Sequence, residues 1–209
     1  MKIEKSLLII LKSLLFRLRK LPVSFWFNRN IGRFTSIDRR YIAITGRNCI
    51  TIGCKSIISA GARIEAIQSY AGKKYSPRII IGDGVCINQN FHCTSASLVC
   101  IGSGTSITAN CGIFDIIHPY DDIHTNPREQ EIKVKPVIIG ENCLIGMNSV
   151  ILPGVNLGKH VIVGANSTVL NGNYKSYSVL IGSPARVVKR FDVQNNMWRK
   201  TDDAGNFIF

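Results

Sequence analysis

The feature that most constrains this chain is a six-residue period in its C-terminal half. Between residues 139 and 173 an aliphatic side chain recurs at every sixth position. These positions are Ile139, Ile145, Ile151, Leu157, Val163 and Val169. A helix, with about 3.6 residues per turn, does not produce a period of six. A smaller side chain, such as Cys143 or Ser149, stands two positions before most of them, and residues that favour turns lie between.

This period predicts a parallel β-helix, an all-β fold. Residues two apart in an extended segment point the same way, so each six-residue unit supplies one large and one smaller inward side chain. Three units complete a triangular coil of about 18 residues, and coils stacked about 4.8 Å apart bury a continuous column. The same phase appears in residues 52–64, 81–93 and 101–113. We therefore expect a solenoid of about seven coils.

The chain leaves this register twice. The first departure follows Ile64, and the second follows Ile113 and rejoins the repeat at Pro136. Loops on a rigid scaffold often carry functional groups. The second departure holds two of the four His and five of the thirteen acidic residues of the chain. Its His118 stands at the base of the loop on a stiff support, which makes it a candidate general base.

Length and composition indicate a single domain in a reducing compartment. The 209 residues, 45% of them hydrophobic, suffice for one solenoid with short ends. The seven Cys include no C-x-x-C pair, and Cys93, Cys111 and Cys143 fall at interior positions, where a thiol packs as a small apolar group. The formal charge of +13 suits anionic lipid or phosphorylated small molecules. No nucleic-acid-binding motif accompanies it, so we expect no nucleic acid as partner.

Residues 5–21 are predicted to form an amphipathic helix, because leucines follow helical spacing and Pro22 ends the pattern. Its apolar run is shorter than the roughly 20 residues that span a bilayer, and no cleavage site follows. Either the helix lies on a membrane surface, or its apolar face packs on the solenoid or on a partner subunit. The expected segments are 1–38 for the helical part, 39–191 for the β-helix and 192–209 for a tail.

Three motifs resemble the hexapeptide-repeat O-acetyltransferases over roughly residues 81–191. They are the pair His118 and Pro119, the run PVIIGENCLIGMNSVILPGVNLGKHVIVGANSTV from Pro136, and the closing IGSPARVVKRF from Ile181. The resemblance implies a left-handed parallel β-helix. The short length and basic start look most like the enzymes that acetylate bacterial O-antigens or exopolysaccharides. We accordingly expect transfer of an acetyl group from acetyl-CoA to a sugar hydroxyl of a surface polysaccharide or its precursor, in the cytoplasm or peripherally on the inner face of the cytoplasmic membrane.

The resemblance also implies a homotrimer with active sites between neighbouring subunits, no metal and no acyl-enzyme. By its match to the family motif, His118 takes the proton of the attacking hydroxyl. Asn88 and Asp115 match acceptor-binding positions. The positions that match acetyl-CoA contacts are Gly146, Met147, Gly164, Ala165, Arg186 and Lys189. Asp115, Asp121 and Glu129 are alternatives for the group that orients the imidazole.

Other functions stay open. The chain departs from the family pattern near the coenzyme positions, with Leu144 where Trp is frequent and Met147 where Ser or Ala is frequent. An acetyltransferase for serine or an antibiotic is one alternative, although we do not expect the long helical N-terminal domain of serine acetyltransferases. A zinc site like that of gamma-type carbonic anhydrases would need a third His besides His118 and His124. The last alternative is a non-catalytic scaffold.

Overall fold

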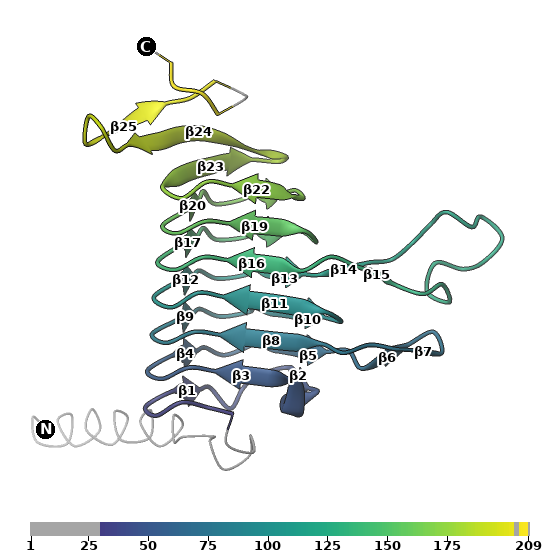
Figure 1. The fold of residues 1–209 in the computed structure, drawn as a ribbon. Helices are drawn as coiled ribbons and strands as arrows, with labels where there is room; N and C mark the ends of the chain where they lie inside the picture. The colour runs from purple at the N-terminus through teal and green to yellow at the C-terminus, as the bar shows by residue number, and fades with distance from the viewer. Residues whose placement is uncertain (1–29, 203–204, 209) are drawn as a thin grey trace, which may run out of the picture.

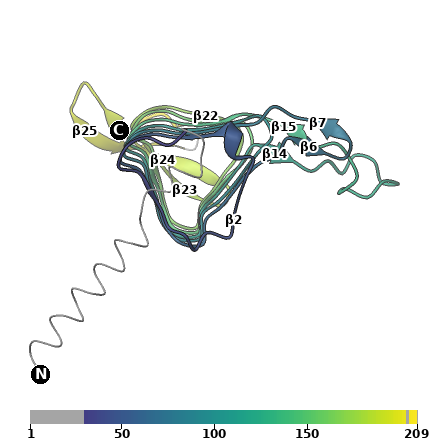
Figure 2. The same ribbon diagram turned by 90° about the horizontal axis from the view of Figure 1, so that it is seen from below.

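The computed structural model of this chain, which describes residues 30–202 and 205–208, is a triangular parallel β-helix (Figures 1 and 2). Along each coil the chain passes from face 1 to face 2 to face 3. Face 1 contains β3 (Ile50–Ile52), β8 (Arg78–Ile81), β11 (Leu98–Ile101), β16 (Val137–Ile139), β19 (Val155–Leu157) and β22 (Gly172–Tyr174). Face 3 contains β2 (Ala43–Thr45), β5 (Arg63–Ala66), β10 (His92–Ser95), β13 (Gly112–Phe114), β18 (Val150–Ile151) and β21 (Thr168–Val169).

Face 2 is the largest sheet and shows the number of coils. Its parallel strands are β1 (Ser36–Ile37), β4 (Ile57–Ile58), β9 (Cys86–Ile87), β12 (Ser106–Ile107), β17 (Leu144–Ile145), β20 (Ile162–Val163) and β23 (Ser178–Gly182). Two antiparallel strands, β24 (Ala185–Asp192) and β25 (Met197–Lys200), extend it to nine. A short 3-10 turn, η2 (Arg47–Cys49), lies between β2 and β3. The seven parallel strands confirm the predicted seven coils.

The buried column confirms the six-residue period. Every aliphatic residue that the period places inside is at most 2% exposed, from Ile52 in the first run to Val169 in the last. Cys93 occupies one of these positions and is 0% exposed. Burial raises the pKa of its thiol, because the thiolate would lose its hydration there. This thiol therefore acts as an apolar side chain, as predicted.

The ends of the β-helix differ from the expected boundaries. The strand β1 and the bridge between Ile31 and Ile52 belong to the first coil, so a boundary after residue 38 lies too late. The strand β24 runs across residue 191, and β25 in the expected tail pairs with it. The predicted N-terminal helix and its membrane contact lie outside the described residues. In the part of the chain that the structure describes, no helix has the length and apolar character of a membrane span.

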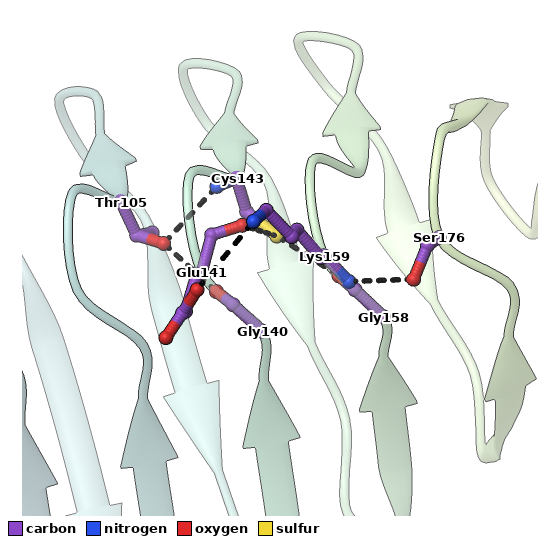
Figure 3. A network of polar contacts seen from close by, with 7 residues as sticks. All are labelled: Thr105, Gly140, Glu141, Cys143, Gly158, Lys159 and Ser176. Atoms are coloured by element: carbon purple, nitrogen blue, oxygen red, sulfur yellow. Dashed lines mark hydrogen bonds and ion pairs between the residues drawn. The ribbon is translucent and has the colours of Figure 1, made fainter. Parts of the chain in front are cut away.

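The smaller inward side chains join successive coils. At the corner between faces 1 and 2, the Thr105 hydroxyl donates to the Gly140 carbonyl at 2.9 Å, and the Cys143 thiol donates to the Gly158 carbonyl at 3.2 Å (Figure 3). At the corner between faces 2 and 3, the Ser149 hydroxyl donates to the Gly164 carbonyl at 2.9 Å. These groups are small because they must reach a carbonyl of the next coil beside the aliphatic column.

Asparagines form a ladder along the corner between faces 2 and 3. The side-chain amides of Asn90, Asn110, Asn148 and Asn166 are linked in series by three hydrogen bonds of 3.0 Å. Each residue has a φ between 56° and 60°, in the left-handed region that asparagine tolerates better than other non-glycine residues. The ladder therefore stabilises a turn that repeats from coil to coil.

We expect Asn148→Ala to lower the free energy of unfolding by about 1–3 kcal/mol, because it removes two ladder hydrogen bonds and places a β-carbon at a positive φ. Asn148→Gly should cost less, since glycine adopts this φ without strain. Urea denaturation of both variants measures the difference. Equal losses would show that backbone conformation contributes nothing at this corner.

Candidate functional site

Two hairpins leave the β-helix at the same corner, between faces 3 and 1 (Figure 2). The first contains β6 (Ser69–Tyr70) and β7 (Lys73–Lys74) and follows β5. The second contains β14 (Ile116–Ile117) and β15 (Lys133–Val134) and follows β13. Both were predicted as departures from the repeat, and the structure shows that their bases are antiparallel strand pairs. Figure 1 shows them projecting to the same side, two coils apart.

His118 lies at the base of the longer hairpin, directly after β14, and its side chain is exposed. The Tyr70 ring of the shorter hairpin lies edge-on to the imidazole, with ring centroids 5.4 Å apart. Two further contacts join the hairpins. Lys73 Nζ lies 2.7 Å from Glu131 Oε2, and the Tyr75 hydroxyl donates to the Ile132 carbonyl at 3.2 Å. The imidazole is thus held at a supported base while the rest of its hairpin extends outward.

Asp115 anchors this hairpin to the coil below. Its carboxylate is fully buried and accepts hydrogen bonds from the Ser95 hydroxyl at 2.7 Å and from the backbone amides of Ala96 and Ser97 at 2.8 Å. This arrangement corrects the expectation that Asp115 binds the acceptor or orients His118. A carboxylate without exposed surface, whose oxygens face three donors of the neighbouring turn, has a structural role here.

Replacing Asp115 by Asn should lower the free energy of unfolding by about 1–3 kcal/mol, because the amide nitrogen would face a buried donor. Asp121→Asn is the matched control, since Asp121 forms only an exposed pair with Lys133 and should change stability by less than about 1 kcal/mol. Chemical denaturation compares the two variants. An equally mild effect of both would contradict the anchoring role.

The other candidates for orienting His118 do not contact it. Asp121 pairs with Lys133 on β15, and Glu129 is exposed, with its backbone amide donating to Asn126. Within the described ranges, no carboxylate forms an ion pair or hydrogen bond with the His118 ring. Among the described residues, its ring contact is with Tyr70. Tyr70 was not predicted as a site residue, although Ile64 and Ile113 each close a run of three units, which implies that both departures from the repeat use one corner.

Most residues that were matched to acetyl-CoA contacts lie along a different corner, the one between faces 2 and 3. Gly146 and Met147 follow β17, and Gly164 and Ala165 follow β20 one coil above. Met147 is 48% exposed, and Ala165 is exposed as well. The exposed Arg186 pairs with Ile181 on β23, which lies above Gly164. These residues thus form a continuous edge that ends in a positive charge.

Lys189 is exposed farther along β24, opposite Val179, and so lies away from the β23–β24 turn that holds Arg186. The glycine at 146 also has a structural reason. A β-carbon there would lie 2.5 Å from the Ala165 nitrogen, and at Gly140 the same atom would lie 2.5 Å from the Gly158 oxygen. Coil stacking alone therefore requires glycine at 146, and its presence is not by itself an indication of a ligand.

Asn88 and His118 do not meet within one chain. Asn88 follows β9 at the corner between faces 2 and 3, below the edge that carries Gly146, and is half-buried. His118 stands at the other corner of face 3. Residues 90–96 cross that face, so the two corners are on the order of 20 Å apart at about 3.3 Å per residue. The predicted residues thus form two separate groups on one protomer.

His124 and His160 take no part in either group. His124 is exposed in the longer hairpin, where its backbone amide donates to Asp122. His160 occupies a turn position with a φ of 54°, and its ring lies 5.8 Å from that of Tyr177. Among the residues described by the structure, no three His, Cys, Asp or Glu side chains are grouped as metal ligands would be.

Comparison with known proteins finds the repeat. Residues 136–171 match the family model described as the hexapeptide repeat of succinyl-transferase. The Saccharomyces cerevisiae (strain ATCC 204508 / S288c) protein YJL218W, whose name provisionally assigns it as an acetyltransferase, is 36% identical over 84 residues. The match covers 40% of this chain and 41% of that protein. The chain therefore spans about two fifths of the length of this curated relative.

Solved structures share the fold. The N-acyltransferase AntD from Bacillus cereus, in complex with dTDP and 3-hydroxybutyryl-CoA, superposes with a TM-score of 0.69 at 17% identity, covering 85% of this chain and 92% of that chain. The hexapeptide-repeat acetyltransferase VCA0836 from Vibrio cholerae O1 biovar eltor, complexed with acetyl-CoA, has a TM-score of 0.55 at 26% identity. This second match covers 66% of this chain and 69% of that chain.

Proposed function

We propose that this chain, which carries the hexapeptide repeat of the acyltransferases over residues 136–171, transfers an acetyl group from acetyl-CoA to a sugar hydroxyl. The observation that carries the proposal is the exposed imidazole of His118, supported at the base of a hairpin that Asp115 anchors and Tyr70 contacts. The proposal includes the left-handed winding and the absence of an acyl-enzyme that the sequence resemblance implies.

The edge between faces 2 and 3 that carries Gly146, Met147, Gly164 and Ala165 supports acetyl-CoA as the donor. The VCA0836 structure contains acetyl-CoA and the AntD structure contains 3-hydroxybutyryl-CoA. In this chain Met147, Ala165 and Ile181 offer an exposed apolar strip along the corner, on which the pantetheine arm would lie. Arg186 stands at its end, where a guanidinium would bind a phosphate through charge-assisted hydrogen bonds. We propose Lys189 only as a more distant phosphate contact.

His118 supplies the proton transfer. One imidazole nitrogen accepts the proton of the sugar hydroxyl while the hydroxyl oxygen forms a bond to the thioester carbonyl carbon. The bond from that carbon to sulfur then breaks, and the imidazolium returns the proton to the leaving thiolate. General-base catalysis of this kind contributes about 10²–10⁴-fold to the rate. A sugar amine could be acylated by the same steps, so the chemical nature of the product decides between an ester and an amide.

The separation of the two groups supports a homotrimer. An acceptor held by Asn88 and a donor along the Gly146 edge lie roughly 20 Å from His118 of the same protomer, too far for proton transfer. A cyclic, head-to-tail assembly would place the His118 corner of one protomer against the Asn88 corner of the next. We therefore propose that each active site forms between two copies.

The acceptor proposed here is a sugar of a bacterial surface polysaccharide or its precursor. The formal charge of +13 favours an acceptor that carries phosphate or a position near anionic lipid. The proposed location is the cytoplasm or the inner face of its membrane, with the segment before residue 30 as the candidate membrane contact. Serine and antibiotics remain in the panel of acceptors to be tested.

His118→Ala should lower kcat by about 10²–10⁴-fold and leave acetyl-CoA binding unchanged, because it removes only the base. Transfer from labelled acetyl-CoA to nucleotide sugars, lipid-linked oligosaccharides, serine and antibiotics provides the assay. Release of the label by mild alkali identifies an ester rather than an amide. His124→Ala in the same hairpin is the control and should keep full activity. Undiminished transfer by the His118 variant would refute the proposed mechanism, whereas no transfer by the wild-type protein to any acceptor of the panel would favour a scaffold.

Mixing two inactive variants tests the intersubunit site. When unfolded Asn88→Ala and His118→Ala chains are refolded together in equal amounts, about a quarter of the interfaces would combine an intact Asn88 with an intact His118. We expect about a quarter of the wild-type activity, although each variant alone is nearly inactive. A mixture no more active than its parents would mean that each site lies within one chain.

A further inference from the structure

We propose that the outer surface of face 3 carries a sugar-binding cluster made of Arg63, Glu65, His92 and Phe114. It lies on β5, β10 and β13, between the corners that carry His118 and Asn88. The proposal rests on the proposed function, because it names the part of that site which holds the acceptor. None of these four residues was singled out by the sequence motifs.

The strand register brings the four residues together. His92 pairs with Arg63 on one side and with Gly112 on the other. Two positions along, Thr94 lies between Glu65 and Phe114. Side chains two apart on a strand share a face, so these groups all point away from the core.

A charged network connects the polar members. Arg63 Nε lies 2.7 Å from Glu65 Oε2, and Arg63 Nη2 lies 3.1 Å from Glu65 Oε1. His92 Nε2 lies 3.2 Å from the Thr94 hydroxyl and 3.5 Å from Glu65 Oε2. The side chains of Arg63, Glu65 and His92 are 47%, 20% and 40% exposed. The network therefore fixes these groups in place while leaving part of each available.

Phe114 adds an apolar ring beside this network. Its ring lies over Gly112, where an added β-carbon would be 2.6 Å from Phe114 Cε2. It meets the His92 ring edge-on, with centroids 5.1 Å apart and an interplanar angle of 87°. Glycine at 112 thus makes room for a half-exposed aromatic side chain on the strand that leads to Asp115 and His118.

The position of the cluster connects it with the chemistry. Phe114 ends β13, Asp115 is buried directly after it, and His118 follows three residues later, directly after β14. Figure 2 shows that the two hairpins project beyond the corner between faces 3 and 1. The outer surface of face 3 therefore borders the space beside these hairpins. A ligand on this surface would lie beside the His118 corner, which the proposed assembly sets against the Asn88 corner of the next copy.

The chemical groups of the cluster suit a sugar ring. Glu65 keeps acceptor capacity beyond its bonds to Arg63, and Arg63 Nη1 and His92 Nδ1 have no partner within the described residues. Neighbouring sugar hydroxyls both donate and accept, and so require donors and acceptors side by side. Phe114 offers an apolar surface for the C–H groups of the ring.

Kinetic measurements test the assignment. We expect His92→Ala, Glu65→Gln and Phe114→Ala each to raise the KM for the acceptor by about tenfold or more, with little change in kcat, in the KM for acetyl-CoA or in Tm. Thr51→Ala, an exposed residue on face 1, is the control and should change none of these values. An unchanged acceptor KM in all three variants would overturn the proposal.

Direct binding separates this inference from the proposed activity. Saturation-transfer NMR of the wild-type protein with the methyl α-glycosides of glucose, galactose and mannose should give a signal for at least one sugar, and His92→Ala and Phe114→Ala should abolish it. Such a result stands even if no acetyl transfer is found, in which case the proposed function alone fails. No wild-type signal for any of the sugars, or signals that persist in both variants, would refute the binding cluster.

Discussion

The close vertical approach of successive coils is the constraint on which this structure depends. At Gly146 and Gly140 the backbone of the next coil leaves no space for even a β-carbon, and small inward side chains such as Cys143 and Ser149 bond to carbonyls across the same gap. Nothing can be inserted between two coils that stack in this way. The chain can therefore expand only at the corners, and every proposed functional group lies at a corner or on an outer face.

The fold was predictable because close stacking of the coils requires an inward aliphatic side chain at every sixth position of the sequence. A slip of one residue would turn an isoleucine such as Ile145 outward, so the period survives as a visible pattern. The hexapeptide-repeat resemblance and the seven coils are confirmed for the same reason. The ends were less predictable. Within residues 30–202, β1 and β25 are the two edge strands of face 2, and their residues need not keep the interval.

The site was predictable only in part. The motif and the position of the loop predict His118 as the base, and the structure places it at the exposed base of a hairpin, where its role stays a prediction. Asp115 could not be distinguished from an exposed loop acid in the sequence, because its partners at Ser95 to Ser97 are separated from it by 18 to 20 residues. The neighbours His92 and Glu65 are 27 positions apart and are joined only by strand register. Such contacts follow from the pairing of neighbouring coils. Because the hairpin β6–β7 lies between β5 and β10 in the sequence, the register of these two strands cannot be counted from the six-residue period alone.

The hairpin of β24 and β25 has a consequence for how copies of this molecule can associate. A stack of parallel strands ends in a row of unpaired backbone groups, which invites another stack to continue it. Here the last strand pair of face 2 runs antiparallel and sets Lys189 opposite Lys200 and Arg190 opposite Arg199. Because β24 runs antiparallel to β23 and β25 antiparallel to β24, the outermost strand again has the direction of the coils. Asp192 pairs with Arg199, but Lys189, Arg190 and Lys200 leave this rim positively charged, so that it repels an identical rim. End-to-end growth into fibrils is thereby disfavoured by charge.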